Sequence, residues 1–286
     1  MTRAYDPATN PRDSMKISFI GGGNMATALI AGLAGKVEQP ADLHVVDPNA
    51  DALARLHDTY GVTTSPDIGT HVAASDVIVL AVKPQQMRDV AVHLQAQLGK
   101  QPLLLSIAAG IRGADLSRWL GGYGAIVRTM PNTPALIGQG ITGMVAMAGV
   151  STAQKDAADS IMRAVGQTVW LDEESLIDPV TAVSGSGPAY VFYFLEAMQQ
   201  AAAEMGLSAE QGKALALATF TGAAQLAAQS DEPVDVLRQR VTSKGGTTHA
   251  AITSMEAAGV KQAIVAAMKA AAARGRELGE EMGKDA

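Results

Sequence analysis

A glycine-rich turn near the start of the chain restricts the possible fold more than any other feature. Residues 16–20, with apolar side chains at Ile17, Phe19 and Ile20, predict a short strand, and Gly21-Gly22-Gly23-Asn24-Met25-Ala26 follows it directly. Gly21 allows a tight turn, Gly23 lets a phosphate approach the backbone, and Ala26 lets the next helix pack closely on the strand. The first amides of that helix would face an anion. The stretch therefore predicts the opening unit of a Rossmann domain.

A second predicted strand, residues 43–46, ends in an acid, Asp47. Asp47 lies about 20 residues beyond the glycine turn, where dinucleotide-binding folds place a carboxylate on the cofactor ribose. Together the turn and the acid indicate a nicotinamide or flavin cofactor. The alternative is a flavodoxin-like sheet without a nucleotide, in which Asp47 is only a turn residue at the end of a strand.

Further apolar runs continue the alternation of strands and helices. Residues 76–82 and 103–107 are typical of strands buried in a parallel sheet. Ligands of such sheets bind beyond the carboxyl ends of the strands, which makes Lys83, Pro84 and Ala109 candidate cofactor contacts. The alternative interpretation of Lys83-Pro84 is a strand terminator with a solvated lysine.

The second half of the chain carries almost no strand signal beyond residue 178, and it is rich in alanine. Ser151 and Ser208, each followed three residues later by glutamine, predict capping boxes that open two helices. Pro188 suits a first helical position, and residues 189–205 are apolar almost all round, as in a helix buried on several sides. We expect a disordered lead over residues 1–14, a Rossmann dinucleotide-binding domain over 15–175 and an all-helical domain over 176–286.

Composition excludes several classes of protein. A net charge of -6 over 286 residues argues against a nucleic-acid binder, because no basic stripe is available to displace phosphate counterions. No cysteine is present and the five histidines are scattered, so we expect neither disulfides nor a metal site, and a cytoplasmic protein. Residues 1–14 lack the apolar core of a signal peptide, and no apolar run approaches the roughly 20 residues that cross a bilayer. The 48% hydrophobic content suggests that some apolar surface is buried between subunits.

A loop rich in glycine and hydroxyl groups, residues 241–248, precedes a predicted helix that begins near His249. The free amides and positive dipole end of a first helical turn favour an anion, and hydroxyl groups can donate to its oxygens. The loop therefore predicts a carboxylate site. The alternative is ordinary N-capping of the helix by Thr247 or Thr248, which is common for threonine.

Six motifs, taken in order, resemble one family, pyrroline-5-carboxylate reductase. The resemblance covers nearly all of the chain from Met15 onward, and the last three motifs are highly specific. They are Ile20-Gly21-Gly22-Gly23-Asn24-Met25, Ala81-Val82-Lys83-Pro84, Ser106-Ile107-Ala108-Ala109-Gly110, Arg128-Thr129-Met130-Pro131-Asn132-Thr133-Pro134, Ala182-Val183-Ser184-Gly185-Ser186-Gly187-Pro188-Ala189-Tyr190 and Ser243-Lys244-Gly245-Gly246-Thr247-Thr248.

The resemblance implies an enzyme that reduces the cyclic imine 1-pyrroline-5-carboxylate to L-proline with NADPH or NADH, the last step of proline biosynthesis. It further implies a helical second domain that provides substrate contacts and interlocks two subunits, with some members forming decamers. For the mechanism, our hypothesis is that Thr248 hydrogen-bonds the ring nitrogen, assists its protonation and so acts as the catalytic residue. By resemblance, the substrate contacts would be Ser243, Gly246, Thr247, Thr248 and Ser184, and the cofactor contacts Gly21, Gly22, Gly23, Asn24, Met25, Val82, Lys83, Pro84 and Ala109. Asp47 joins the predicted cofactor contacts because of its position after the second strand.

Two residues depart from the family pattern. Lys244 stands where the family often has proline, which could loosen the loop or add positive charge beside an anionic substrate. Asp47 stands where other members often have serine, threonine or arginine. A carboxylate there repels a 2′-phosphate and should favour NADH, although neighbouring groups could compensate.

Two other functions fit a Rossmann domain followed by helices. A β-hydroxyacid dehydrogenase would depend on a helical lysine as its acid-base group, and the predicted helix over residues 189–205 contains none. A catalytically silent NAD(P) sensor would not need the hydroxyl-rich loop 243–248. Cofactor binding without turnover would distinguish the sensor.

Overall fold

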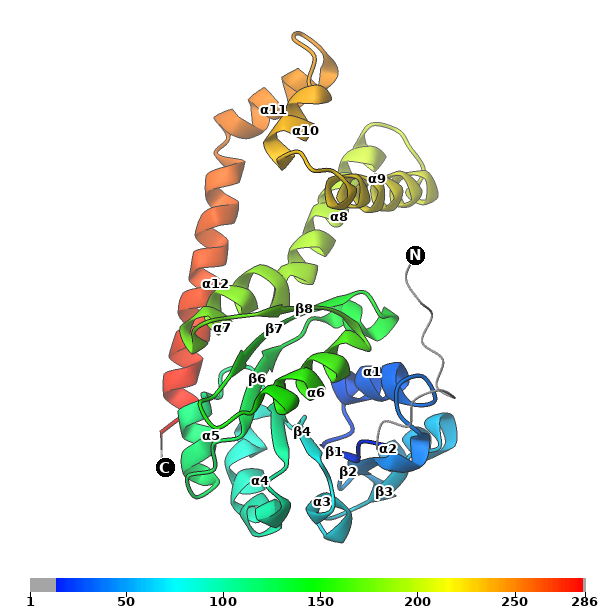
Figure 1. Ribbon diagram of the computed structural model, residues 1–286. Helices are drawn as coiled ribbons and strands as arrows, with labels where there is room; N and C mark the ends of the chain where they lie inside the picture. The colour runs from blue at the N-terminus through cyan, green and yellow to red at the C-terminus, as the bar shows by residue number, and fades with distance from the viewer. Residues whose placement is uncertain (1–13, 285–286) are drawn as a thin grey trace. The chain divides into compact units, whose positions relative to one another are not determined.

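The computed structural model describes residues 14–284, which form two compact units (Figure 1). The first unit extends to Gly185 and takes in the chain again from Ala272, whereas the second comprises Ser186–Ala271. The predicted lead over residues 1–14 lies outside the described residues apart from Ser14. The predicted division at residues 175 and 176 stays a prediction, since the compact units divide ten residues later, between Gly185 and Ser186.

The first unit contains an eight-stranded sheet in the order β3-β2-β1-β4-β5-β6-β7-β8. All neighbouring strands are parallel except β6 and β7. The strands are β1 (Ile17–Ile20), β2 (Leu43–Val46), β3 (Thr63–Ser65), β4 (Val77–Leu80), β5 (Leu103–Ser106), β6 (Ile126–Met130), β7 (Gly140–Ala146) and β8 (Gly166–Trp170). The strand order reverses between β1 and β4, and such a switch point opens a ligand crevice at the carboxyl ends of the strands.

Helices cover both faces of this sheet because its central strands alternate between two hydrophobic cores. Phe19, Val45 and Val79 face the core under α1, α2 and α6, whereas Ile20 and Leu80 face the core under α4 and α5. The helices of this unit are α1 (Asn24–Leu33), α2 (Ala50–Tyr60), α3 (Thr70–Ala73), α4 (Met87–Leu94), α5 (Gly113–Trp119), α6 (Thr152–Arg163) and α7 (Ile177–Val180). Burial on both faces explains why the central strands are predominantly apolar in sequence, without a polar face.

All regular secondary structure of the second unit, Ser186–Ala271, is helical. Its helices are α8 (Gly187–Glu204), α9 (Ala209–Gln229), α10 (Val234–Arg240) and α11 (Thr247–Ala257), together with the first half of α12 (Val260–Met282). Among residues 14–284, no helix is long and apolar enough to span a membrane.

The local signals at helix starts are confirmed. Reciprocal capping boxes join Ser151 to Gln154 at α6 and Ser208 to Gln211 at α9. The expectation that α8 is buried on several sides is wrong for the single chain, because Tyr193 is 73% exposed. Apolar groups exposed in this way are typical of a surface that another subunit covers.

Candidate active site

The glycine turn has the geometry that a pyrophosphate needs. Gly21 has φ +104°, and its amide donates to Val46 O at 2.8 Å. A Cβ on Gly21 would lie 2.7 Å from the carbonyl oxygen of Ala81, so only glycine fits there. Gly23 is the N-cap of α1 without a side-chain cap bond, and a Cβ on it would meet no atom within 4 Å. The amides after Gly23 and the open space beside it fit an anion.

Asp47 is bound to this turn. Its Oδ2 accepts from the amide of Gly22 at 2.8 Å, and its Oδ1 accepts from the amide of Asn49 at 2.8 Å. The two bonds fix the carboxylate at the carboxyl ends of β1 and β2. Each oxygen retains acceptor capacity for a ribose hydroxyl.

The remaining cofactor candidates of the first unit lie at the same edge of the sheet. Val82 and Lys83 follow β4, and Ala109 follows β5. Pro84 begins a short 3₁₀ helix, Pro84–Gln86. Because β1, β4 and β5 are adjacent and parallel, the segments after them line one edge together with the glycine turn. Lys83 and Ala109 are exposed there.

A buried histidine supports the strand that carries Asp47. His44 stacks on His71 with ring centroids 4.5 Å apart, and its nitrogens meet the hydroxyls of Thr63 and Ser65 at 2.8 and 2.9 Å. Burial, and secondarily the charge of His71, lower the pKa of His44 to about 4. The ring is therefore neutral at physiological pH, and its two hydrogen bonds join β2 to β3.

Ser184, a predicted substrate contact, lies in a π-helical turn, Thr181–Gly185, at the end of the first unit. Its hydroxyl donates to Val180 O at 3.1 Å, so its oxygen remains an acceptor. Its own carbonyl accepts from the side chain of Asn132 at 3.2 Å. No sequence signal predicts this last contact, which joins residues 52 positions apart.

The hydroxyl-rich loop belongs to the second unit, between α10 and α11. Gly246 is the N-cap of α11 without any side-chain cap bond, so the alternative of capping by Thr247 or Thr248 is wrong, and the helix begins at Thr247 instead of near His249. The Gly246 amide donates to Ser243 O at 3.0 Å, and a Cβ on Gly246 would lie 2.7 Å from Ser243 Oγ. The loop therefore brings Ser243 to the first turn of α11, and capping does not occupy the threonine hydroxyls.

Arg128 on β6 forms an ion pair within the first unit. The residue is 5% exposed, and its Nη1 lies 2.6 Å from Oε1 of Glu174. The same carboxylate oxygen accepts from the amide of Gly113 at 2.6 Å. Glu174 thus joins β6 to the start of α5, so Arg128 has a structural role.

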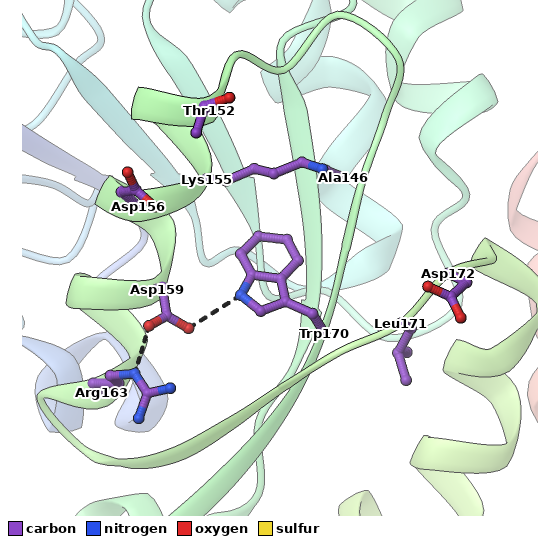
Figure 2. Close-up of a pocket in the computed structure, with 9 residues that line it drawn as sticks. All are labelled: Ala146, Thr152, Lys155, Asp156, Asp159, Arg163, Trp170, Leu171 and Asp172. Atoms are coloured by element: carbon purple, nitrogen blue, oxygen red, sulfur yellow. Dashed lines mark hydrogen bonds and ion pairs between the residues drawn. The ribbon is translucent and has the colours of Figure 1, made fainter.

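A separate surface pocket contains none of the predicted site residues (Figure 2). Asp159 on α6 accepts from Thr168 and Trp170 of β8 at 2.7 and 3.1 Å, and it pairs with Arg163. Desolvation raises the pKa of Asp159, but the hydrogen bonds from Thr168, Arg163 and Trp170 outweigh it and hold the pKa below its ordinary value. This network joins α6 to the edge strand. No group of three or more His, Cys, Asp or Glu side chains is placed to bind a metal among residues 14–284.

Comparison with known proteins agrees with both units. A family model described as pyrroline-5-carboxylate reductase dimerisation matches residues 174–278, and one described as NADP oxidoreductase coenzyme F420-dependent matches residues 16–110. Pyrroline-5-carboxylate reductase of Pseudomonas aeruginosa is 45% identical over 269 residues, covering 94% of this chain and 98% of the relative.

Two solved structures share the whole architecture. A pyrroline-5-carboxylate reductase from Coxiella burnetii has a TM-score of 0.88 at 40% identity, covering 93% of this chain and 99% of the other. The Plasmodium falciparum pyrroline carboxylate reductase, solved with NADP bound, has a TM-score of 0.83 at 30% identity, covering 93% and 98%. This chain belongs to the pyrroline-5-carboxylate reductase family.

Proposed function

We propose that the protein reduces 1-pyrroline-5-carboxylate to L-proline, with NADPH or NADH as the hydride donor. The similarity to reductases of that name carries the proposal, because it extends over 94% of the chain and so includes both the glycine turn and the hydroxyl-rich loop. The fixed turn, the open space at Gly23 and the uncapped start of α11 support it.

The residues of the first unit would bind the cofactor. The amides that follow Gly23, including those of Asn24 and Met25, would bind the pyrophosphate. Asp47 would accept from a ribose hydroxyl, and the segments at Val82-Lys83-Pro84 and Ala109 would line the path toward the nicotinamide. The bound cofactor supplies a hydride.

The residues of the second unit would bind the substrate. The amide of Thr247 and the hydroxyl of Ser243 would bind its carboxylate beside Gly246, and the Thr248 hydroxyl would accept from the N–H of the protonated ring nitrogen. The carbon of a nitrogen-protonated imine is already electrophilic. The main task of the protein is therefore to align the substrate ring with the nicotinamide ring. Alignment of this kind can lower a barrier by about 7–11 kcal/mol.

Thr248→Ala is expected to lower kcat/KM for the imine roughly 10- to 100-fold, since one hydrogen bond to a charged group is lost. Steady-state kinetics at saturating cofactor measure the effect. Thr253→Ala removes another exposed hydroxyl from the same helix and serves as the matched control. Wild-type turnover and affinity in Thr248→Ala would remove Thr248 from the mechanism.

Asp47→Ser is expected to raise the ratio of kcat/KM with NADPH to that with NADH about 10- to 100-fold, because a carboxylate repels a nearby 2′-phosphate. The ratio is the correct readout, since the lost bond to Gly22 affects both cofactors. Asp58→Ser on α2 changes the net charge equally and serves as the control. An unchanged ratio would show that Asp47 does not govern the preference between NADPH and NADH.

The proposed assembly is a homodimer, with a decamer as the larger form. The dimerisation model over residues 174–278 and the exposed apolar side chains of the second unit support it, among them Phe192, Tyr193 and Leu226. Light scattering on a size-exclusion column distinguishes the masses of monomer, dimer and decamer. We place the protein in the cytoplasm, with a small molecule as its substrate and neither nucleic acid nor membrane as a partner.

The deciding experiment follows the absorbance of the reduced nicotinamide with 1-pyrroline-5-carboxylate, using NADH and NADPH side by side. Turnover that yields proline is the expected result. A protein that binds the cofactor and does not turn over would instead favour hydroxy-acid chemistry or cofactor sensing.

A further inference from the structure

We propose that Asn132 is a positioning residue for the reduction, and that it acts by fixing the backbone at Ser184. The inference rests on the proposed function, because the family resemblance makes Ser184 a substrate contact in that reaction. It goes beyond that function by assigning a role to a side chain that lies 52 residues away in sequence.

The carbonyl of Ser184 cannot accept the backbone hydrogen bond that an α-helix ordinarily supplies. In a continuing helix its donor would be the amide of residue 188, and that residue is Pro188, which has no N–H. The chain also makes a π-helical turn over Thr181–Gly185, and such turns frequently occur at functional sites. The orientation of the peptide after Ser184 therefore depends on a donor from elsewhere.

Asn132 supplies that donor. It lies two residues after the end of β6, and its Nδ2 donates to Ser184 O at 3.2 Å, while its Oδ1 accepts from the amide of Ile141 on β7 at 3.0 Å. Asn132 occupies the N-cap position of a 3₁₀ helix, Thr133–Ile137, yet makes no side-chain cap bond there. Its amide instead joins the start of β7 to the π-helical turn.

Packing restricts the same peptide from another side. A Cβ on Gly185 would lie 2.5 Å from Cε of Met130, the last residue of β6. The end of β6 thus contacts the turn through Met130 and, two residues later, hydrogen-bonds it through Asn132. Two independent contacts fix the Ser184-Gly185 peptide, and a shift of about 1 Å at a reacting group can cost on the order of 100-fold in rate.

The test compares Asn132→Ala and Asn132→Asp with wild type and with Gln154→Ala. Asn132→Asp keeps the acceptor for Ile141 but places a carboxylate oxygen against Ser184 O. Gln154 is the matched control, since its amide also bridges a backbone N–H and a backbone carbonyl, at Ser151 and Gln101. Measurements are kcat, KM for imine and cofactor, and amide hydrogen exchange of peptides that cover residues 181–187.

Both Asn132 variants are expected to lose roughly 10- to 100-fold in kcat near neutral pH, with the cofactor KM changed by less than about threefold. Exchange over residues 181–187 accelerates, and Gln154→Ala matches wild type. The kcat of Asn132→Asp relative to wild type rises as pH falls from about 8 to about 5, because a protonated carboxyl again donates to Ser184 O.

Wild-type kcat in Asn132→Ala, or unchanged exchange over residues 181–187, would overturn the positioning role while the proposed function stands. The same holds if Asn132→Asp shows no pH-dependent recovery. A wild-type protein that reduces no imine would overturn the proposed function and, with it, this role in the reaction.

Discussion

Gly21→Ala is expected to lower the free energy of unfolding by about 2–4 kcal/mol and to weaken cofactor binding by at least roughly 100-fold. Gly21 has φ +104°, a conformation that alanine adopts only with strain. The added methyl would also lie 2.7 Å from Ala81 O, which is backbone of the neighbouring β4 segment and cannot rotate away. Denaturant unfolding and fluorescence titration with NADH measure the two effects.

Gly23→Ala separates the effect on stability from the effect on cofactor binding. A Cβ on Gly23 meets no atom within 4 Å, and the backbone there is extended, so the free energy of unfolding should stay within about 0.5 kcal/mol of wild type. Cofactor affinity should still fall, because the methyl fills the space that a phosphate needs. Unchanged affinity for NADH in Gly23→Ala would show that the pyrophosphate does not approach this turn.

Much of the first unit could be predicted because its signals are local. The glycine turn, the acid after β2 and the capping residues each act over a few positions, and the buried strands β1, β2, β4 and β5 are predominantly apolar runs. Because these strands are parallel, their carboxyl ends lie at one edge of the sheet, which is enough to bring the cofactor candidates together there. The choice of Lys83 and Ala109 as candidates needed no further information, although their contacts with a cofactor stay a prediction.

Two strands, β3 and β7, carry no such signal. β3 consists of Thr63, Thr64 and Ser65, and β7 contains two glycines, Gly140 and Gly143. Gly143 packs against α7, where a Cβ would lie 2.7 Å from Val180 Cγ1. The glycine that weakens the strand pattern is thus required by tertiary packing.

Contacts between segments far apart in the chain could not be predicted from the sequence, because no local pattern indicates them. The Arg128–Glu174 pair spans 46 residues and the Asn132–Ser184 bond 52. Threonine at residues 247 and 248 also allowed two interpretations, and only the backbone shows that Gly246 is the N-cap. Because Gly246 is the N-cap, the hydroxyls of Thr247 and Thr248 are not used for capping and are available to bind another group.

Glu174→Ala is expected to destabilise the protein more than Arg128→Met does, although the two residues form one ion pair. Removing Glu174 leaves the buried guanidinium of Arg128 without its carboxylate and the amide of Gly113 without its acceptor. Loss of a buried partner in this way costs about 3 kcal/mol of the free energy of unfolding.

Arg128→Met is expected to cost less stability, because the Glu174 side chain is 29% exposed and water reaches it once the arginine is gone. Arg128→Met also keeps much of the buried stem, and we expect a loss of about 1–2 kcal/mol. The double variant should lose less than the sum of the single ones, since no unpaired buried charge remains. Urea unfolding at one fixed protomer concentration measures all three, because assembly makes stability depend on concentration. Equal losses in the single variants, or strict additivity in the double one, would mean that the pair does not compensate a buried charge and that Arg128 contributes to β6 through packing alone.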